Sequence, residues 1–226
     1  MIVLGIDPGS LRAGFGVVGE QGGRLHALAE GVLRPRADWP LERRLAHLHE
    51  EVRRLLQSYA PDVVAIESVF HGVNTRSLVT LGQARGAILA ALGARTGLLI
   101  ELSPAEIKKS VTGGGRAGKA QVAHMLGVLF GPEWRARQAQ SRHSADATDA
   151  LGVALAGLHR SRALQAKGSG ESVAESAGTT PAITAAARGV PRKPSSRAQR
   201  QALLRRLALR SEVVPGSSRL DPPRGG

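Results

Sequence analysis

The length and composition of the chain limit what it can be. Its 226 residues suffice for one well-packed domain with an extension, and the lack of cysteine excludes disulfides and cysteine-ligated metal sites. The formal net charge of +13 favours a polyanionic partner such as nucleic acid, whereas the lack of a long apolar run or a signal-peptide pattern predicts a soluble, cytoplasmic protein without membrane contacts.

The first predicted elements are strands. Residues 2–7, 14–19 and 24–33 are apolar segments that favour strands, and Gln21-Gly22-Gly23 is typical of a hairpin turn between the second and the third. Leucine and valine at spacings of three and four residues then predict an amphipathic helix from about Pro40 to Tyr59.

Short strands and helices alternate in the next segment. Residues 62–66 and 98–102 predict buried parallel strands, and the Ala-, Leu- and Gly-rich segment from 74 to 94 predicts a helix between them. Further helices are expected at 104–110, 119–130 and 145–158. A hairpin meander followed by this alternation indicates the α/β class, with a mixed five-stranded sheet and helices on both faces.

The composition changes near residue 161. We therefore expect an ordered domain over residues 1–160 and a tail over 161–226 that is rich in Ala, Gly, Ser, Pro and Arg and is disordered. This tail carries +8 of the net charge. A short basic helix at 197–210 is the alternative within it.

Two acidic residues stand at the carboxyl ends of predicted strands. Asp7 ends the first strand, and Glu67 directly follows the strand at 62–66. If these strands are parallel neighbours, both carboxylates lie at the sheet edge where open α/β proteins bind ligands. Glu101, one residue before a strand end, is a weaker candidate, and Asp62 lies at the wrong end of its strand.

Two more acids lie near the start of the last predicted helix. Asp146 and Asp149 are three residues apart and share one helix face, with His143 one turn earlier. Taken alone, this pair is explained by the preference of helix N-termini for negative charge. If it converges with Asp7 and Glu67, four carboxylates would repel one another unless cations were bound. Such an all-oxygen site suits Mg²⁺ or Mn²⁺, and two such ions can promote phosphodiester hydrolysis.

Several motifs, in this order, resemble those of one enzyme family. The segments GIDPGS, AIESVF, LGQARG and ADATDAL resemble the RuvC family of Holliday junction resolvases, and the resemblance covers about residues 1–158. It implies an RNase H-like fold, a homodimer, and symmetric nicking of four-way DNA junctions in two strands of like polarity, in recombination and repair. It also implies two Mg²⁺ ions per subunit, for which Mn²⁺ can substitute, and a branch-migration motor complex of the RuvA/RuvB type as partner.

The resemblance also assigns roles to individual residues. The catalytic and metal-binding acids would be Asp7, Glu67, Asp146 and Asp149. Phe70 would stack on bases near the cut, and Lys108 and Lys119 would contact the scissile region. Three further basic residues are candidates for contacts with the DNA backbone: Arg76, Lys109 and Arg116. His143 is a candidate for proton handling, with an ordinary helix-start residue as the alternative. The expected dimer seam is the helix from residue 74, because its small residues permit close approach: Gly82, Ala84, Gly86 and Ala87.

Other functions compete with this prediction. The GGGRAGKA segment at 113–120 lacks the Ser or Thr that a phosphate-binding P-loop needs after its lysine, so we expect no nucleotide site there. The opening GIDPGSLRAGFG also resembles the first phosphate hairpin of actin and sugar kinases, which need two such domains. Another RNase H-like nuclease, acting on RNA–DNA hybrids or other branched DNA, stays open as an alternative. A non-catalytic nucleic-acid binder is disfavoured, because four clustered acids would weaken its affinity for nucleic acid.

Overall fold

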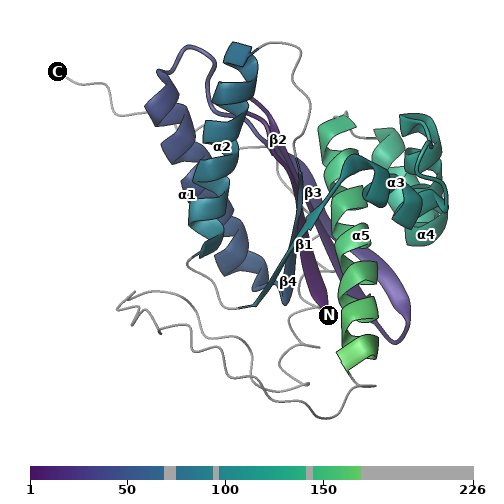
Figure 1. The fold of residues 1–226 in the computed structure, drawn as a ribbon. Coiled ribbons are helices and arrows are strands. Elements are labelled where there is room, and N and C mark those ends of the chain that lie inside the picture. Colours follow the sequence, from purple (N-terminus) through teal and green to yellow (C-terminus); the bar gives the residue numbers. More distant parts are fainter. Residues whose placement is uncertain (69–74, 94–96, 141–144, 169–226) are drawn as a thin grey trace. The chain divides into compact units, whose positions relative to one another are not determined.

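The computed structural model describes residues 1–68, 75–93, 97–140 and 145–168 (Figure 1). All of them belong to one unit of the chain, Met1–Lys193, and a second unit, Pro194–Gly226, lies outside the described residues. Residues 169–226 of the predicted tail, with the alternative of a basic helix at 197–210, therefore also lie outside them.

A five-stranded mixed sheet forms the centre of the fold. Its strands are β1 (Ile2–Asp7), β2 (Ala13–Gln21), β3 (Arg24–Leu33), β4 (Val63–Glu67) and β5 (Leu98–Leu102). They are arranged in the order β3-β2-β1-β4-β5. The first three strands pair antiparallel, and β4 pairs parallel to both β1 and β5. The predicted fold class and its five strands are thus confirmed.

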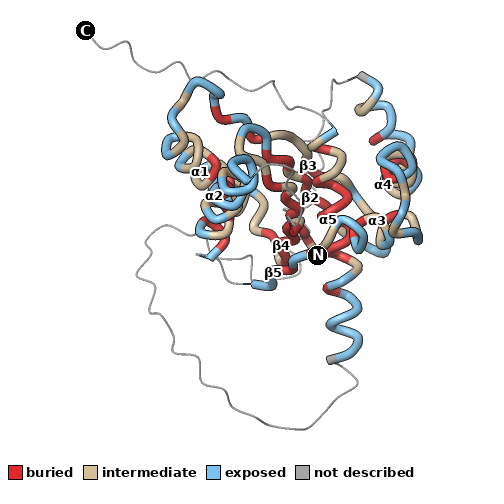
Figure 2. Tube along the Cα trace, turned by 45° about the horizontal axis from the view of Figure 1, so that its top comes forward, coloured by how far each residue is buried: buried red, intermediate tan, exposed pale blue. Residues whose placement is uncertain are grey.

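Helices cover both faces of this sheet. Helices α1 (Leu41–Tyr59) and α2 (Thr75–Gly93) lie on one face, and α5 (Ala145–Gly168) lies on the other (Figure 1). The shorter α3 (Pro104–Thr112) and the long α4 (Lys119–Gln140) pack on the outside of α5. Figure 2 shows the buried positions gathered along the strands and along α5, so the main core lies between the sheet and this helix.

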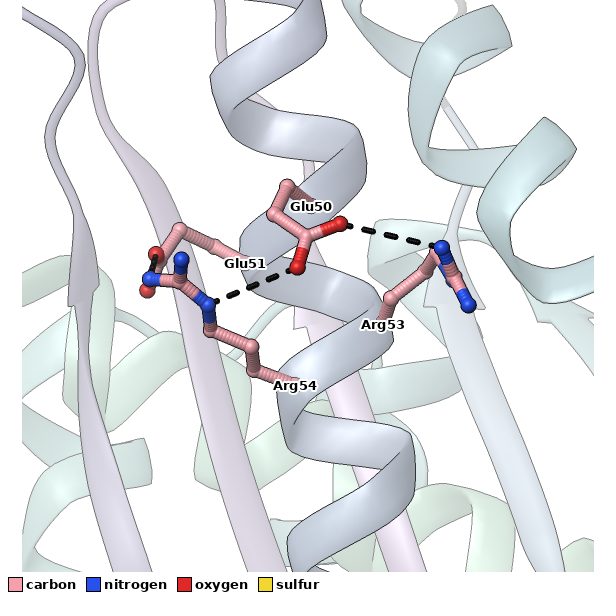
Figure 3. Close-up of polar contacts among 4 residues, drawn as sticks. All are labelled: Glu50, Glu51, Arg53 and Arg54. Carbon is pink, nitrogen blue, oxygen red and sulfur yellow. Dashed lines mark hydrogen bonds and ion pairs between the residues drawn. The ribbon is translucent and has the colours of Figure 1, made fainter. Parts of the chain in front are cut away.

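Helix α1 illustrates how the amphipathic pattern divides buried from exposed positions. Leu48 and Val52 are buried, whereas the outer face carries ion pairs between residues three and four apart (Figure 3). Arg54 Nε lies 3.5 Å from a carboxylate oxygen of Glu50, and Arg54 Nη1 lies 2.5 Å from one of Glu51. All of these side chains belong to α1, which covers the face of the sheet opposite to α5 and its two aspartates.

The close packing of α5 on the sheet depends on glycines in β1 and β2. A Cβ atom at Gly5 would lie 2.3 Å from the backbone nitrogen of Ala154, and one at Gly16 would lie 2.6 Å from that of Leu151. Real Cβ atoms do not approach backbone so closely, so only glycine permits this spacing. The same helix carries Asp146 and Asp149, and its height above the sheet therefore sets the position of both acids.

Two predicted helix ends are wrong. Helix α5 continues to Gly168, ten residues beyond the predicted end, so the expected boundary at residue 161 falls inside the helix. The extension is held by two contacts that are distant in sequence: the buried Ser161 hydroxyl donates to Met1 Sδ, and Arg162 pairs with Glu20. Helix α4 breaks at Gly131 (φ 84°), close to its predicted end, but then resumes to Gln140.

None of the helices in the described part of the chain is long and apolar enough to cross a membrane.

Candidate active site

The parallel pairing of β1 and β4 brings the two strand-end acids together. Ile6 is the register partner of Ile66, so Asp7 and Glu67 follow at the same edge of the sheet. Side chains alternate between the two faces of a strand. Gly5 lies against α5, and Ala65 lies against Gly157 of the same helix, so Asp7 and Glu67, two residues further along, face α5 as well.

Helix α5 brings the other two acids to this edge. Gly14 is the register partner of Asp7 on β2, and a Cβ atom at Gly14 would lie only 2.1 Å from the backbone oxygen of Asp146. The first turn of α5 therefore crosses the sheet directly beside Asp7. Asp149 follows one turn later, and both aspartates are partly buried.

Electrostatic coupling shows that the four carboxylates form one cluster. Burial is the main cause that raises the pKa of Asp7 to about 7, and three neighbouring negative charges raise it further. In order of effect, these are Glu67, Asp149 and Asp146. Burial, followed by the charge of Asp149, also raises the pKa of Glu67. The convergence expected from the sequence is therefore present.

Basic side chains surround the cluster. Lys119 Nζ lies 2.8 Å from Asp149 Oδ2, and its charge opposes the rise in the pKa of both Asp7 and Glu67. Lys108 on α3 acts on Glu67 in the same direction. Arg12, from the loop between β1 and β2, places Nε 2.9 Å from Asp146 Oδ2. Arg12 is not among the residues predicted from the sequence, because an arginine five residues after Asp7 gives no signal of its partner on α5.

Other predicted residues are not brought to the cluster. Glu101 is the register partner of Ile66, so it faces the opposite side of the sheet from Glu67, where it pairs with Arg85 of α2 at 2.6 Å. Arg76, Lys109 and Arg116 are exposed on α2, on α3 and in the loop before α4, and their DNA contacts stay predictions. Phe70 and His143 lie outside the described residues.

The glycine-rich segment before α4 was expected not to bind nucleotide. It follows a helix, α3, rather than the strand that precedes a P-loop, and Ala120 offers no hydroxyl group. The Gly113 backbone (φ 80°) instead ends α3 by donating its N–H to Lys109 O.

Comparisons with known proteins identify the family. The family profile described as crossover junction endodeoxyribonuclease RuvC matches residues 3–157. This chain belongs to the RuvC family. The predicted family and enzyme class are thus confirmed.

Individual members of the RuvC family are similar over most of the chain. A crossover junction endodeoxyribonuclease RuvC of Chlorobaculum parvum is 44% identical over 165 residues, which are 73% of this chain and 84% of that protein. The RuvC of Thermomicrobium roseum is 42% identical over 73% of this chain and 97% of its own length. The structure of T. thermophilus RuvC in complex with a Holliday junction substrate matches with a TM-score of 0.65 at 28% identity, over 72% of this chain and 96% of that one.

The carboxylate cluster suits the divalent metal ion that RuvC nucleases require. Its ligands are all oxygens, which Mg²⁺ prefers. Asp146 Oδ2 is buried and receives no hydrogen bond, since the nearby Arg12 Nε is not aligned as a donor to it. Among the described residues, however, no three His, Asp or Glu side chains are already arranged to hold one ion. Two of the four acids are instead paired with Arg12 and Lys119.

The raised pKa of Asp7 predicts how the metal-free protein responds to pH. Its pKa of about 7 lies above the ordinary value of 3.8, so the folded state holds a proton that the unfolded chain has lost. Asp7 therefore stabilises the fold most at low pH, and this contribution is lost as the pH rises through 7. Replacing Asp7 with Asn should make the protein more stable at pH 8 than wild type, by on the order of 2–4 kcal/mol, with the gain vanishing near pH 4.

Urea unfolding in EDTA at several pH values measures this difference. Glu50→Gln, which removes a carboxylate paired with arginines on the outer face of α1, is the control, and it should not be more stable than wild type at pH 8 (Figure 3). A stability difference between Asp7→Asn and wild type that stays constant from pH 4 to pH 8 would contradict the assignment.

Proposed function

We propose that this chain resolves four-way DNA junctions by symmetric, metal-dependent nicking of two strands of like polarity. The observation that carries the proposal is the convergence of four carboxylates from β1, β4 and α5 at one edge of the sheet. The similarity to a RuvC structure described with a Holliday junction substrate supports four-way junctions as the substrate class.

The acids of the cluster have complementary tasks in this proposal. The charges of all three other carboxylates raise the pKa of Asp7, so Asp7 would be the central ligand. Together with Glu67, Asp146 and Asp149 it would hold two Mg²⁺ ions. Mn²⁺ can take the same ligands. When bound, such ions supply activation of a water molecule and stabilisation of the leaving oxygen. Hydrolysis of this kind leaves 5′-phosphate and 3′-hydroxyl ends that a ligase can join.

The cationic groups around the cluster attract and orient the DNA. The positive charge of Lys108 acts on Glu67, and Lys119 is paired with Asp149. A phosphodiester that enters the site would contact both lysines. Arg76, Lys109 and Arg116 are exposed and would contact the backbone further away, where each contact adds salt-dependent affinity. Phe70 would stack on bases near the cut, and His143 is a candidate for proton handling beside Asp146.

Two nicks require two active sites, and we propose α2 as the seam of a homodimer. Leu78 and Val79 are 40% and 56% exposed, and Cβ atoms at Gly82 and Gly86 would meet nothing within 4 Å. An exposed apolar and small-residue surface of this kind suits a second copy of the chain. The prediction that Ala84 contributes to the seam is wrong, because Ala84 is fully buried within its own subunit.

The basic segment after α5 and the motor partner complete the proposal. Helix α5 ends at Gly168, and the remaining residues of the predicted tail would add sequence-independent DNA affinity or dock a branch-migration motor of the RuvA/RuvB type.

A substrate comparison tests the proposed function. Labelled immobile junction, mobile junction, duplex and RNA–DNA hybrid are each incubated with the protein and Mg²⁺, with EDTA as the control. We expect paired, symmetric nicks in the junctions alone, at sites that a ligase can reseal. Cleavage of the hybrid would instead support the alternative RNase H-like nuclease, and uncut junctions would contradict the proposal.

A further inference from the structure

The ion pair between Arg12 and Asp146 joins a loop residue of unassigned role to one of the proposed metal ligands. We propose that Arg12 is a positioning residue that holds Asp146 while no metal is bound and transfers to a DNA phosphate when Asp146 turns to the metal. This inference rests on the proposed function, because it assumes that Asp146 is a metal ligand.

The backbone fixes where Arg12 can act. Arg12 lies directly before β2, in the loop that follows Asp7, and a Cβ atom at Gly9 would lie only 2.0 Å from Arg12 O. The loop is therefore folded back tightly on itself, with the backbone of Gly9 against the backbone of Arg12. This tight turn keeps the Arg12 backbone at the edge of the sheet where Asp7 ends β1.

The side chains show that the ion pair can be exchanged. The Arg12 side chain is 56% exposed, whereas that of Asp146 is 31% exposed, so the guanidinium stands on the solvent side of the carboxylate. Asp146 Oδ2 receives no hydrogen bond despite the 2.9 Å separation from Nε. An ion pair whose cation is exposed to solvent is weak, so a divalent cation can displace the guanidinium.

The other acid on α5, Asp149, also has a cationic partner that is exposed to solvent. Asp149 pairs with Lys119, whose side chain is 76% exposed, whereas Asp7 and Glu67 have no ion pair with any described residue. Both acids on α5 thus have a cationic partner from a separate segment, and the two acids on the strands do not. A metal that recruits the α5 acids must release these cations toward solvent, where DNA would lie.

Arginine suits the second half of this exchange. Its planar guanidinium forms two parallel hydrogen bonds with a phosphate group, and it stays charged under all relevant conditions. While Asp146 holds Arg12, that phosphate contact is not made. Arg12 should therefore weaken metal binding in the absence of DNA and strengthen DNA binding only in the presence of metal.

Two measurements on the full chain test this inference. Calorimetric titration of the DNA-free protein with Mg²⁺ should show that Arg12→Gln binds the ion about 2- to 5-fold more tightly than wild type, because a competing cation is gone. The salt dependence of junction binding is then measured in EDTA and in Ca²⁺, which takes the same oxygen ligands. In Ca²⁺ the slope for Arg12→Gln should be smaller by about 1, and in EDTA it should equal that of wild type.

Two further variants separate this role from a general loss of charge. Arg54→Gln removes an arginine that is also paired with carboxylates but lies on α1, on the opposite face of the sheet from α5, and it should change neither measurement (Figure 3). Arg12→Lys keeps the positive charge and should restore the salt slope in Ca²⁺.

The outcomes distinguish the inference from the proposed function. If wild type binds Mg²⁺ and cuts junctions but Arg12→Gln binds Mg²⁺ equally or less tightly, the exchange is wrong and the proposed function stands. A salt slope that falls equally in EDTA and in Ca²⁺ would also overturn it, since Arg12 would then contact DNA without leaving Asp146. If wild type neither binds Mg²⁺ nor cuts junctions, the proposed function fails, and the inference fails with it.

Discussion

An Asp7→Asn variant should bind four-way junctions as tightly as wild type and cut them at least about 10³-fold more slowly. Asparagine keeps the shape of the side chain but removes its charge, and Asp7 is the acid whose pKa is raised by all three other carboxylates. Loss of a ligand that holds metal ions removes several kcal/mol of transition-state stabilisation, whereas DNA affinity depends on basic residues elsewhere. Single-turnover cleavage and gel-shift measurements on the same junction separate the two effects.

The chain offers a matched control for this experiment. Glu30 on β3 is a second partly buried acid whose pKa burial raises to about 7, and Gln138 Nε2 of α4 donates to it at 2.7 Å. It lies outside the cluster, so Glu30→Gln should keep the cleavage rate within about threefold of wild type, a change below 1 kcal/mol in the barrier. Full activity in Asp7→Asn, with junction binding intact, would show that the cluster is not the catalytic site.

A Gly5→Ala variant should lose about 3 kcal/mol or more of folding stability, which is a large share of the total for a domain of this size. The added Cβ would lie 2.3 Å from Ala154 N and 2.4 Å from Ala150 O, and both of these atoms belong to the backbone of α5. The helix must therefore move away from the sheet, because no side chain can rotate to make room. Urea unfolding of the metal-free protein measures the loss.

Gly152→Ala is the control for this substitution, because Gly152 lies on the same helix but faces α3 and α4. A Cβ atom there would meet the side chains of Ile107, Val122 and Val111 at 3.6–3.9 Å, which are ordinary contact distances. The exchange should be neutral or stabilise the protein by up to about 1 kcal/mol, since alanine favours a helix interior over glycine. If both variants had equal stability, the close approach of α5 to β1 would not be a constraint on the fold.

The same displacement should also affect the site. Asp146 and Asp149 are carried by α5, whereas Asp7 and Glu67 are carried by the strands, so lifting the helix separates the two pairs. Where Gly5→Ala still folds, its affinity for Mg²⁺ should therefore fall, whereas that of Gly152→Ala should not.

Local patterns in the sequence predicted the elements, apart from two helix ends, and the convergence of the four acids, whose catalytic role stays a prediction. Alternation and apolar runs predicted all five strands, because a strand buried on one or both faces must have apolar side chains at a period of two or throughout. The position of Asp7 and Glu67 at strand ends then predicted their meeting, since the carboxyl ends of parallel strands share one edge of the sheet. The order of the motifs predicted the family, and three of the four quoted motifs contain these acids.

The tertiary structure alone decided the partners of these groups. The register of β4 and β5 turned Glu101 to the face opposite Glu67, and the packing of the folded chain buried Ala84 completely. The contacts of Ser161 with Met1 and of Arg162 with Glu20 extended α5 beyond the point at which its apolar pattern ends. Arg12 met Asp146 across more than 130 residues of chain. Such pairs depend on how segments distant in sequence are brought together, and the local periodicity of one segment contains no information about the other.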